Sequence, residues 1–174
     1  MSKKYNNTFR IPSARASWWD YSKDGTYFIT ICTKNKVHYF GNIVNDEMVL
    51  NDLGKQAFKY WEEITKYHPY VLIDAFIIMP NHIHGIIIID KPYQNLETQT
   101  NNQFGPQSQN LSSIIRGYKS AVTKYAKCNS IVFQWQPRFY DHIIKNAFSY
   151  QNIVNYIYMN PMDWYKDNFN IGNK

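Results

Sequence analysis

The sequence predicts an α+β fold of ferredoxin-like character, in which helices pack on an antiparallel β-sheet. Runs of β-branched and aromatic residues, which are typical of strands, occur at 26–33, 70–79 and 82–90. Apolar residues recur at every third or fourth position at 52–68 and 111–127, which is typical of amphipathic helices. The predicted order is strand, strand, strand, helix, strand, strand, helix, strand, helix. This order favours a sheet covered by helices.

The composition limits the class of protein. The chain has 174 residues, of which 44% are hydrophobic, and this favours one globular domain spanning 1–174. The net charge of +6 fits a polyanionic partner without requiring one. Cys32 and Cys128 have neither zinc-site nor disulfide-scaffold spacing. No apolar segment is long enough to cross a membrane or to act as a signal peptide, so we expect a cytoplasmic protein.

The first part of the chain is expected to hold an arm, a strand, a short hairpin and a helix. The arm is basic and aromatic, and the hairpin turns around Asn45-Asp46. Asn51 or Asp52 can cap the helix that follows the hairpin. In order, these segments are expected at 1–25, at 26–33, at 38–44 with 47–51, and at 52–68.

The rest of the chain is expected to hold an insertion, a helix, a strand and a final helix. Residues 91–109 are rich in Gln and Asn and lack a period, which indicates a flexible insertion. Pro137 places the strand at 132–144 at an edge or a bulge, and the final helix is expected at 147–160. The inner face of the helix at 111–127 is expected to hold Leu111, Ile114, Tyr118, Ala121 and Tyr125.

Two histidines, His82 and His84, begin the strand at 82–90. Alternate residues of a strand share a face, so both side chains point the same way, with Cα atoms about 6.5–7 Å apart. Two imidazoles at that separation can converge on one divalent ion while Ile83 packs on the opposite face. The spacing fits equally well two buried histidines that are satisfied by hydrogen bonds, because burying them unpaired would be costly.

A third ligand has to come from another element of the fold. Pro80-Asn81 alone separates the strands at 70–79 and 82–90, which predicts a tight antiparallel hairpin. In that register Ile77 faces His84. Asp74 falls on the face away from the histidines unless a bulge shifts the pairing.

The final helix carries a tyrosine on a polar stripe. On a helical wheel, Tyr156 lies within about 40° of three polar residues, Ser149, Asn152 and Asn160. Opposite a metal site, Tyr156 becomes a candidate nucleophile, because a cation on a substrate phosphate favours attack by a phenolate. The buried arc of this helix is expected to hold Tyr150, Ile153, Val154, Ile157 and Tyr158.

These motifs resemble the single-tyrosine HUH (histidine–hydrophobe–histidine) transposases, and among them the REP-associated tyrosine transposases. The resemblance rests on MPNHIH at 79–84 followed at this distance by YIYMNP at 156–161. It extends over DYSKDGTYFITICTKNKVHYFG, IIRGYKSAVTKYA and WQPRFYDHII, and so covers most of the chain. It implies a ferredoxin-like or RRM-like antiparallel sheet that carries the histidine pair, with a helix that brings up the tyrosine.

The resemblance also implies roles for individual residues. His82 and His84 match the metal-binding pair, and Tyr156 matches the catalytic tyrosine. Asn160 stands where some relatives have a glutamine metal ligand, although Asn152 competes for that role. Gln151 lies about 140° from Tyr156 on the wheel and is a poor substitute. Mg²⁺ or Mn²⁺ is the expected ion, because the candidate ligands are hard oxygen and nitrogen donors and no cysteine lies near the motif in the sequence.

The implied activity is cleavage and rejoining of single-stranded DNA near hairpins through a 5′-phosphotyrosine bond. The protein would act as a monomer or as a homodimer. His142 belongs to a family-like stretch without an assigned role. Expected contacts with phosphates and bases are Arg10, Arg15, Arg116, Lys119 and Arg138, with Trp18, Trp19 and Trp135. For each of these residues, a core or solvated surface position is the competing interpretation.

Three alternatives compete with a transposase. A domesticated relative could hold DNA hairpins without cutting them, although His82, His84 and Tyr156 are all present. A nucleotide hydrolase with an HxHxH strand requires a third histidine where this chain has Ile86. A structural protein with two core histidines leaves the YIYMNP motif unexplained.

Overall fold

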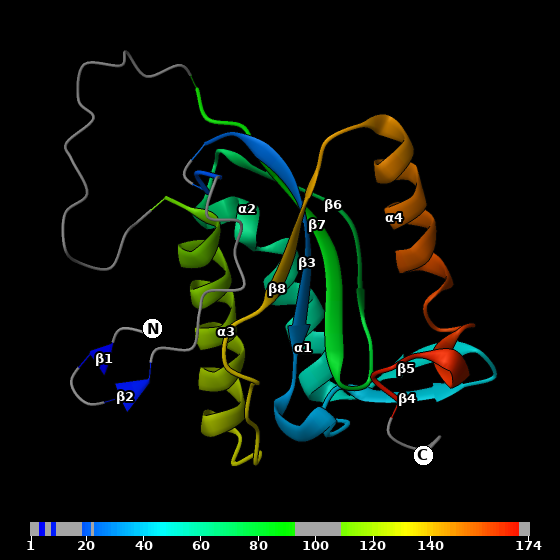
Figure 1. The fold of residues 1–174 in the computed structure, drawn as a ribbon. Helices are drawn as coiled ribbons and strands as arrows, with labels where there is room; N and C mark the ends of the chain where they lie inside the picture. Colours follow the sequence, from blue (N-terminus) through cyan, green and yellow to red (C-terminus); the bar gives the residue numbers. More distant parts are fainter. Residues whose placement is uncertain (1–3, 6–7, 10–18, 22, 93–108, 171–174) are drawn as a thin grey trace.

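The protein is described by a computed structural model that covers residues 4–5, 8–9, 19–21, 23–92 and 109–170. Its centre is a four-stranded antiparallel sheet with the strand order β6-β7-β3-β8 (Figure 1). These strands span Gly25–Cys32 (β3), Val71–Ile78 (β6), His82–Ile89 (β7) and Tyr140–Ile144 (β8). The predicted α+β class and antiparallel sheet are confirmed. Most of the predicted arm at 1–25 and insertion at 91–109 lies outside the described residues.

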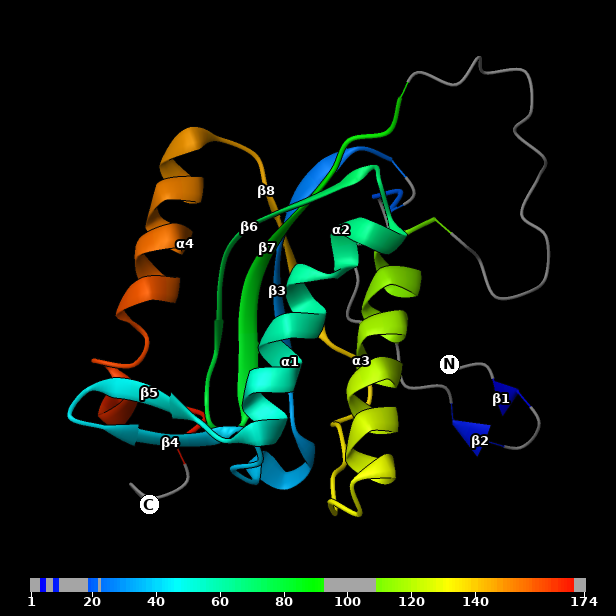
Figure 2. The ribbon, with the colours of Figure 1, turned by 180° about the vertical axis from the view of Figure 1, so that it is seen from behind.

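The helices cover both faces of this sheet (Figure 1, Figure 2). On one face, α1 (Asp52–Glu62) and α3 (Leu111–Cys128) enclose the main core around the buried Tyr27, Ile29 and Ile31 of β3. On the other face, α4 (Ala147–Met159) packs through Ile157 onto a smaller cluster. Chain order and strand order together give the ferredoxin-like arrangement, to which α4 is an addition.

Two short strand pairs lie outside the four-stranded sheet. β4 (Gly41–Val44) and β5 (Glu47–Leu50) form the predicted hairpin, and Asn45 and Asp46 have φ angles of 52° and 61°. Positive φ at both central residues is the signature of a type I′ turn, which Asn and Asp tolerate. β1 (Lys4–Tyr5) pairs with β2 (Thr8–Phe9). None of the described helices is both long and apolar enough to span a membrane.

The β6–β7 hairpin sets the positions of the histidines. Ile77 pairs with His84 as predicted, and the Met79 amide donates to the carbonyl of His82 at 2.8 Å. A bulge lies between Ile73 and Phe76, where the register shifts by one residue. The bulge leaves Asp74 exposed and Ala75 buried against α4, so Asp74 stays away from the histidines.

Some predicted elements are shorter than expected. The helix at 52–68 breaks at Glu63 into α1 and α2 (Ile64–Tyr67). Of the strand at 132–144, only β8 joins the sheet, apart from one isolated bridge between Thr33 and Trp135. Pro137, which cannot donate a backbone hydrogen bond, lies in the segment that fails to pair.

The buried faces of α3 and α4 differ from the predicted ones. In α3, Val122 and Ala126 are buried, whereas the predicted Ala121 and Tyr125 are only half-buried, because the helix is rotated slightly on the sheet. In α4, Tyr158 is 62% exposed rather than part of the core. The apolar arc of α4 is wider than the strip of sheet it covers, and Tyr158 lies at the edge of that arc.

Candidate active site

The two histidines lie side by side on the sheet face that α4 covers. His82 and His84 are 0% and 2% exposed, and their ring centroids are 4.5 Å apart. Ile83 between them is buried in the main core on the opposite face. Burial lowers the pKa of His82 well below its usual range, and burial lowers that of His84 to about 3. Both imidazoles are therefore neutral at pH 7, which is the form that binds metal ions.

Asn81 fixes the orientation of His82. The Asn81 amide nitrogen donates to the carbonyl of Lys36 at 2.9 Å and to that of Phe169 at 2.8 Å. Its oxygen is therefore the atom that lies 2.9 Å from His82 Nδ1, and Nδ1 must donate to it. The proton of the neutral ring is thus on Nδ1, and the lone pair on Nε2 is left for another partner.

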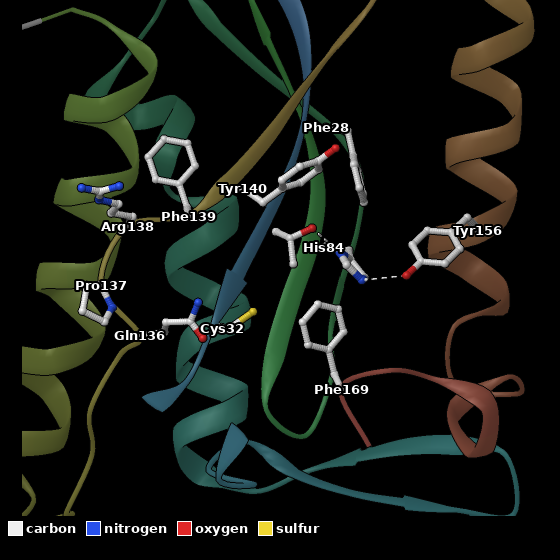
Figure 3. A pocket seen from close by; sticks show the side chains of 11 residues that line it. Phe28, Cys32, His84, Gln136, Pro137, Arg138, Phe139, Tyr140, Tyr156 and Phe169 are labelled. Atoms are coloured by element: carbon white, nitrogen blue, oxygen red, sulfur yellow. Dashed lines mark hydrogen bonds between the residues drawn. The ribbon is translucent and has the colours of Figure 1, made fainter. Parts of the chain in front are cut away.

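His84 connects the sheet to the tyrosine of α4. Its Nδ1 lies 2.9 Å from Thr30 Oγ1 on the adjacent strand β3, and its Nε2 lies 3.2 Å from the hydroxyl of Tyr156. With the proton on Nδ1, the ring donates to Thr30 and accepts from Tyr156. Figure 3 shows the tyrosine reaching from α4 toward this histidine. The structure therefore brings together the predicted strand pair and the predicted tyrosine.

Tyr156 is half-exposed and remains a neutral phenol in this surrounding. It is 46% exposed, and its ring packs against those of Phe28 and His84. Burial raises the pKa of Tyr156, and the negative charge of Asp167 acts in the same direction, while the Asn160 side chain opposes both. A cation beside the phenol would be needed to favour the phenolate.

Three buried polar atoms, one on His82 and two on neighbouring side chains, lack a hydrogen bond of ordinary geometry among the described residues. They are His82 Nε2, Asn160 Oδ1 and Asp167 Oδ2. Asn160 is 3% exposed at the C-terminal end of α4, whereas Asn152 is exposed. Of the two asparagines considered as a third ligand, Asn160 is thus the one that lies in the site. The Asn160 side chain also lies close enough to raise the pKa of His82 and to lower that of Asp167.

Asp167 is a site residue that the sequence pattern does not predict. Its Oδ2 lies 3.9 Å from His82 Nε2. It belongs to an aperiodic segment after α4, for which neither spacing nor periodicity gives a signal. In the described parts of the chain, no cluster of three His, Cys, Asp or Glu side chains is arranged to hold a metal ion on its own.

Cys32 lies near the histidines but is not a reactive group. It pairs with His82 across β3 and β7 and is 9% exposed. Burial raises the pKa of its thiol to about 11, so the thiol stays protonated at neutral pH. Cys32 and Cys128 are both free, as expected.

A cleft of about 560 Å³ opens beside Tyr156, between α4 and the segment that leads into β8 (Figure 3). Its walls are mainly aromatic, and Arg138 and Gln136 add polar groups. A second cleft of about 550 Å³ shares Gln136 and Pro137 with the first and is lined by Lys34 and Lys36. The aromatic lining of the first cleft includes Phe28, Phe139, Tyr140, Tyr156 and Phe169.

The residues predicted to contact DNA lie in different parts of the structure. Arg138 lines the first cleft, and Arg116 is exposed on α3. Lys119 donates to the carbonyls of Gln136 and Arg138, so it holds the cleft wall in place. Contact of these three with DNA stays a prediction. The predicted contacts Arg10, Arg15 and Trp18 lie outside the described residues.

The remaining candidates have structural positions. Trp135 donates from Nε1 to the carbonyl of Lys119, and Trp19 donates to the hydroxyl of Tyr27. Both tryptophans pack against the main core. His142 is exposed on β8, opposite Phe28 on β3, and its role stays open.

The chain is similar to known proteins in sequence and in fold. No protein-family model matches the chain. An uncharacterized protein of Haemophilus influenzae is 44% identical over 175 residues, with 96% of this chain and 97% of that protein covered. The REP-associated tyrosine transposase of Escherichia coli is 26% identical, with 82% of this chain and 69% of that protein covered.

A solved structure of a REP-associated tyrosine transposase bound to a REP hairpin has the same fold. The TM-score is 0.58 at 21% identity, and the match covers 88% of this chain and 74% of that one. Fold and sequence matches thus point to one class, the tyrosine transposases. The chain is similar in sequence to the REP-associated tyrosine transposase of Escherichia coli and shares the fold of the solved one.

Proposed function

We propose that this protein cleaves and rejoins single-stranded DNA beside hairpins, with Tyr156 as the nucleophile and Mg²⁺ or Mn²⁺ as the cofactor. The observation that supports this most is the hydroxyl of Tyr156 lying 3.2 Å from Nε2 of the buried His84. A tyrosine on a separate helix reaches the histidine pair, and the neighbouring cleft leaves room for a substrate.

The side chains present fit a hard divalent cation. His82 Nε2 and Asn160 Oδ1 are buried and lack ordinary hydrogen bonds, and unpaired buried polar atoms are costly unless an ion or water satisfies them. Nitrogen and oxygen donors without a thiolate suit Mg²⁺ or Mn²⁺. His82, His84 and Asn160 would hold the ion. When bound, it would polarise a non-bridging oxygen of the scissile phosphate.

The residues of the chain carry out the rest of the reaction. The Tyr156 oxygen forms a bond to phosphorus, and the bond from phosphorus to the 3′-oxygen breaks. The phenol loses a proton and the departing 3′-oxygen gains one, so the products are a 5′-phosphotyrosine and a free 3′-OH. Attack by another 3′-OH restores Tyr156 and joins the strands without an external energy source, because one phosphodiester replaces another.

The cleft beside Tyr156 suits an unpaired nucleotide. Aromatic side chains offer flat faces on which a base can stack, and Arg138 can contact a phosphate. The solved relative was bound to a REP hairpin. We therefore propose a hairpin with a short unpaired flank as the substrate class for this chain.

Incubating such an oligonucleotide with the protein and Mn²⁺ should give an adduct that survives denaturing electrophoresis. His84→Ala should reduce adduct formation more than about tenfold, because even residues that only orient metal ligands contribute about 10- to 100-fold. His68→Ala is the matched control, since His68 contacts Tyr70 away from the site. Hairpin binding without any adduct under Mg²⁺ or Mn²⁺ would favour the non-cleaving binding module instead.

We further propose that one chain suffices for the reaction, because Tyr156 and His84 meet within a single chain. Mixing Tyr156→Phe protein with His84→Ala protein should therefore leave both inactive. The yield of adduct from the mixture, compared with each variant alone, measures this. A recovered adduct would show that a homodimer exchanges its tyrosine helices.

A further inference from the structure

The segment after α4 folds back over His82. The ring of Trp164 stacks at 6.0 Å from the His82 ring, and that of Phe169 lies at 4.5 Å. The Asn81 amide that orients His82 also holds the carbonyl of Phe169. The aromatic rings and the shared amide place Asp167, which lies between them in the chain, against the histidine.

Only one of the two carboxylate oxygens of Asp167 accepts an ordinary hydrogen bond from a described residue. Its Oδ1 accepts a hydrogen bond from the amide of Phe169 at 2.7 Å. Its Oδ2 is buried without an ordinary hydrogen bond among the described residues, and the side chain is 7% exposed. A buried carboxylate oxygen that faces an unprotonated ring nitrogen is unfavourable unless a cation or a proton lies between them.

We propose that Asp167 is a further ligand of the divalent ion and supplies the only negative charge among its protein ligands. This inference rests on the proposed function, which requires the ion. The His82 Nε2 and Asp167 Oδ2 atoms are 3.9 Å apart. Two donors each about 2.1 Å from one ion can be at most about 4.2 Å apart, so the observed separation lies within the reach of a shared ion.

The charge of the donor set supports the same conclusion. His82, His84 and Asn160 are all neutral, whereas sites for hard divalent cations ordinarily include one or two carboxylates. Strand β7, the C-terminal cap of α4 and the segment that follows this cap each direct one unsatisfied atom to this place. Metal binding would consequently hold this last segment against the sheet.

Asp167→Asn tests the proposal, because it keeps the side-chain shape and removes the charge. Titration of the metal-free protein with Mn²⁺, followed by the electron paramagnetic resonance signal of the free ion, should show at least a tenfold weaker affinity than wild type. The matched control is Asp163→Asn in the same segment. Asp163 is exposed and contacts Lys166, so this variant should bind Mn²⁺ like wild type.

Thermal unfolding without metal separates a ligand from a structural residue. A ligand role predicts that metal-free Asp167→Asn is at least as stable as wild type, because a buried charge is removed, and that Mn²⁺ raises its melting temperature less. Should this variant fold poorly, Asp167→Ser still offers the Phe169 amide an acceptor and gives the same test.

Unchanged Mn²⁺ affinity in a folded Asp167 variant would overturn the role of Asp167. If wild type then still forms the adduct, the proposed function stands. Failure of wild type to bind Mn²⁺ at all would overturn both the ligand assignment and the metal dependence.

Discussion

Tyr156→Phe should form no detectable covalent adduct with a hairpin-bearing single strand, a loss limited only by the sensitivity of the assay. The substitution removes the single oxygen that bonds to phosphorus and keeps the ring, which packs against Phe28 and His84. Because the fold and the cleft are preserved, hairpin binding should change less than about threefold. Denaturing electrophoresis and a mobility-shift assay measure the two quantities separately.

Tyr158→Phe is the matched control for this experiment. Tyr158 lies on the same helix, two residues further on, and is 62% exposed. It points away from the histidines because residues two apart on a helix are separated by about 200°. This variant should form adduct at the wild-type rate. If Tyr156→Phe still gives the adduct, or Tyr158→Phe loses it, Tyr156 is not the nucleophile.

Much of this geometry could be predicted because strands and helices are periodic. Alternation in β7 placed His82 and His84 on one face, and the two-residue turn at Pro80-Asn81 fixed Ile77 opposite His84. On α4 the polar stripe correctly separated Tyr156 from the buried Ile157. In each case a local rule determines the direction of a side chain.

The parts that could not be predicted depend on contacts between distant segments. Asp167 follows the last helix in an irregular stretch, where its approach to His82 is set by Asn81 and two aromatic rings. The exposure of Tyr158 depends on how much of the sheet α4 covers. Neither the wheel nor the strand pattern contains that information, since both describe one element at a time.

Gly85→Ala should lower the free energy of unfolding by about 2–3 kcal/mol, a large fraction of the stability of an ordinary domain. A Cβ at Gly85 would lie 2.5 Å from Cζ2 of Trp61 and 3.0 Å from the Cβ of Phe76. Trp61 is fully buried and held by the rings of Phe76 and Tyr118, so it cannot move aside without disturbing both. Urea denaturation followed by fluorescence measures the change.

Gly117→Ala is the matched control, and it should act in the opposite direction. Gly117 lies on the exposed side of α3, where an added Cβ meets nothing within 4 Å. Alanine favours a helix interior over glycine by about 0.8–1 kcal/mol, so this variant should be more stable than wild type. Gly85 adjoins His84 but faces the main core, so its effect should appear in stability before it appears in Mn²⁺ affinity. Equal stability of Gly85→Ala and wild type would mean that Trp61 does not lie against the backbone of β7.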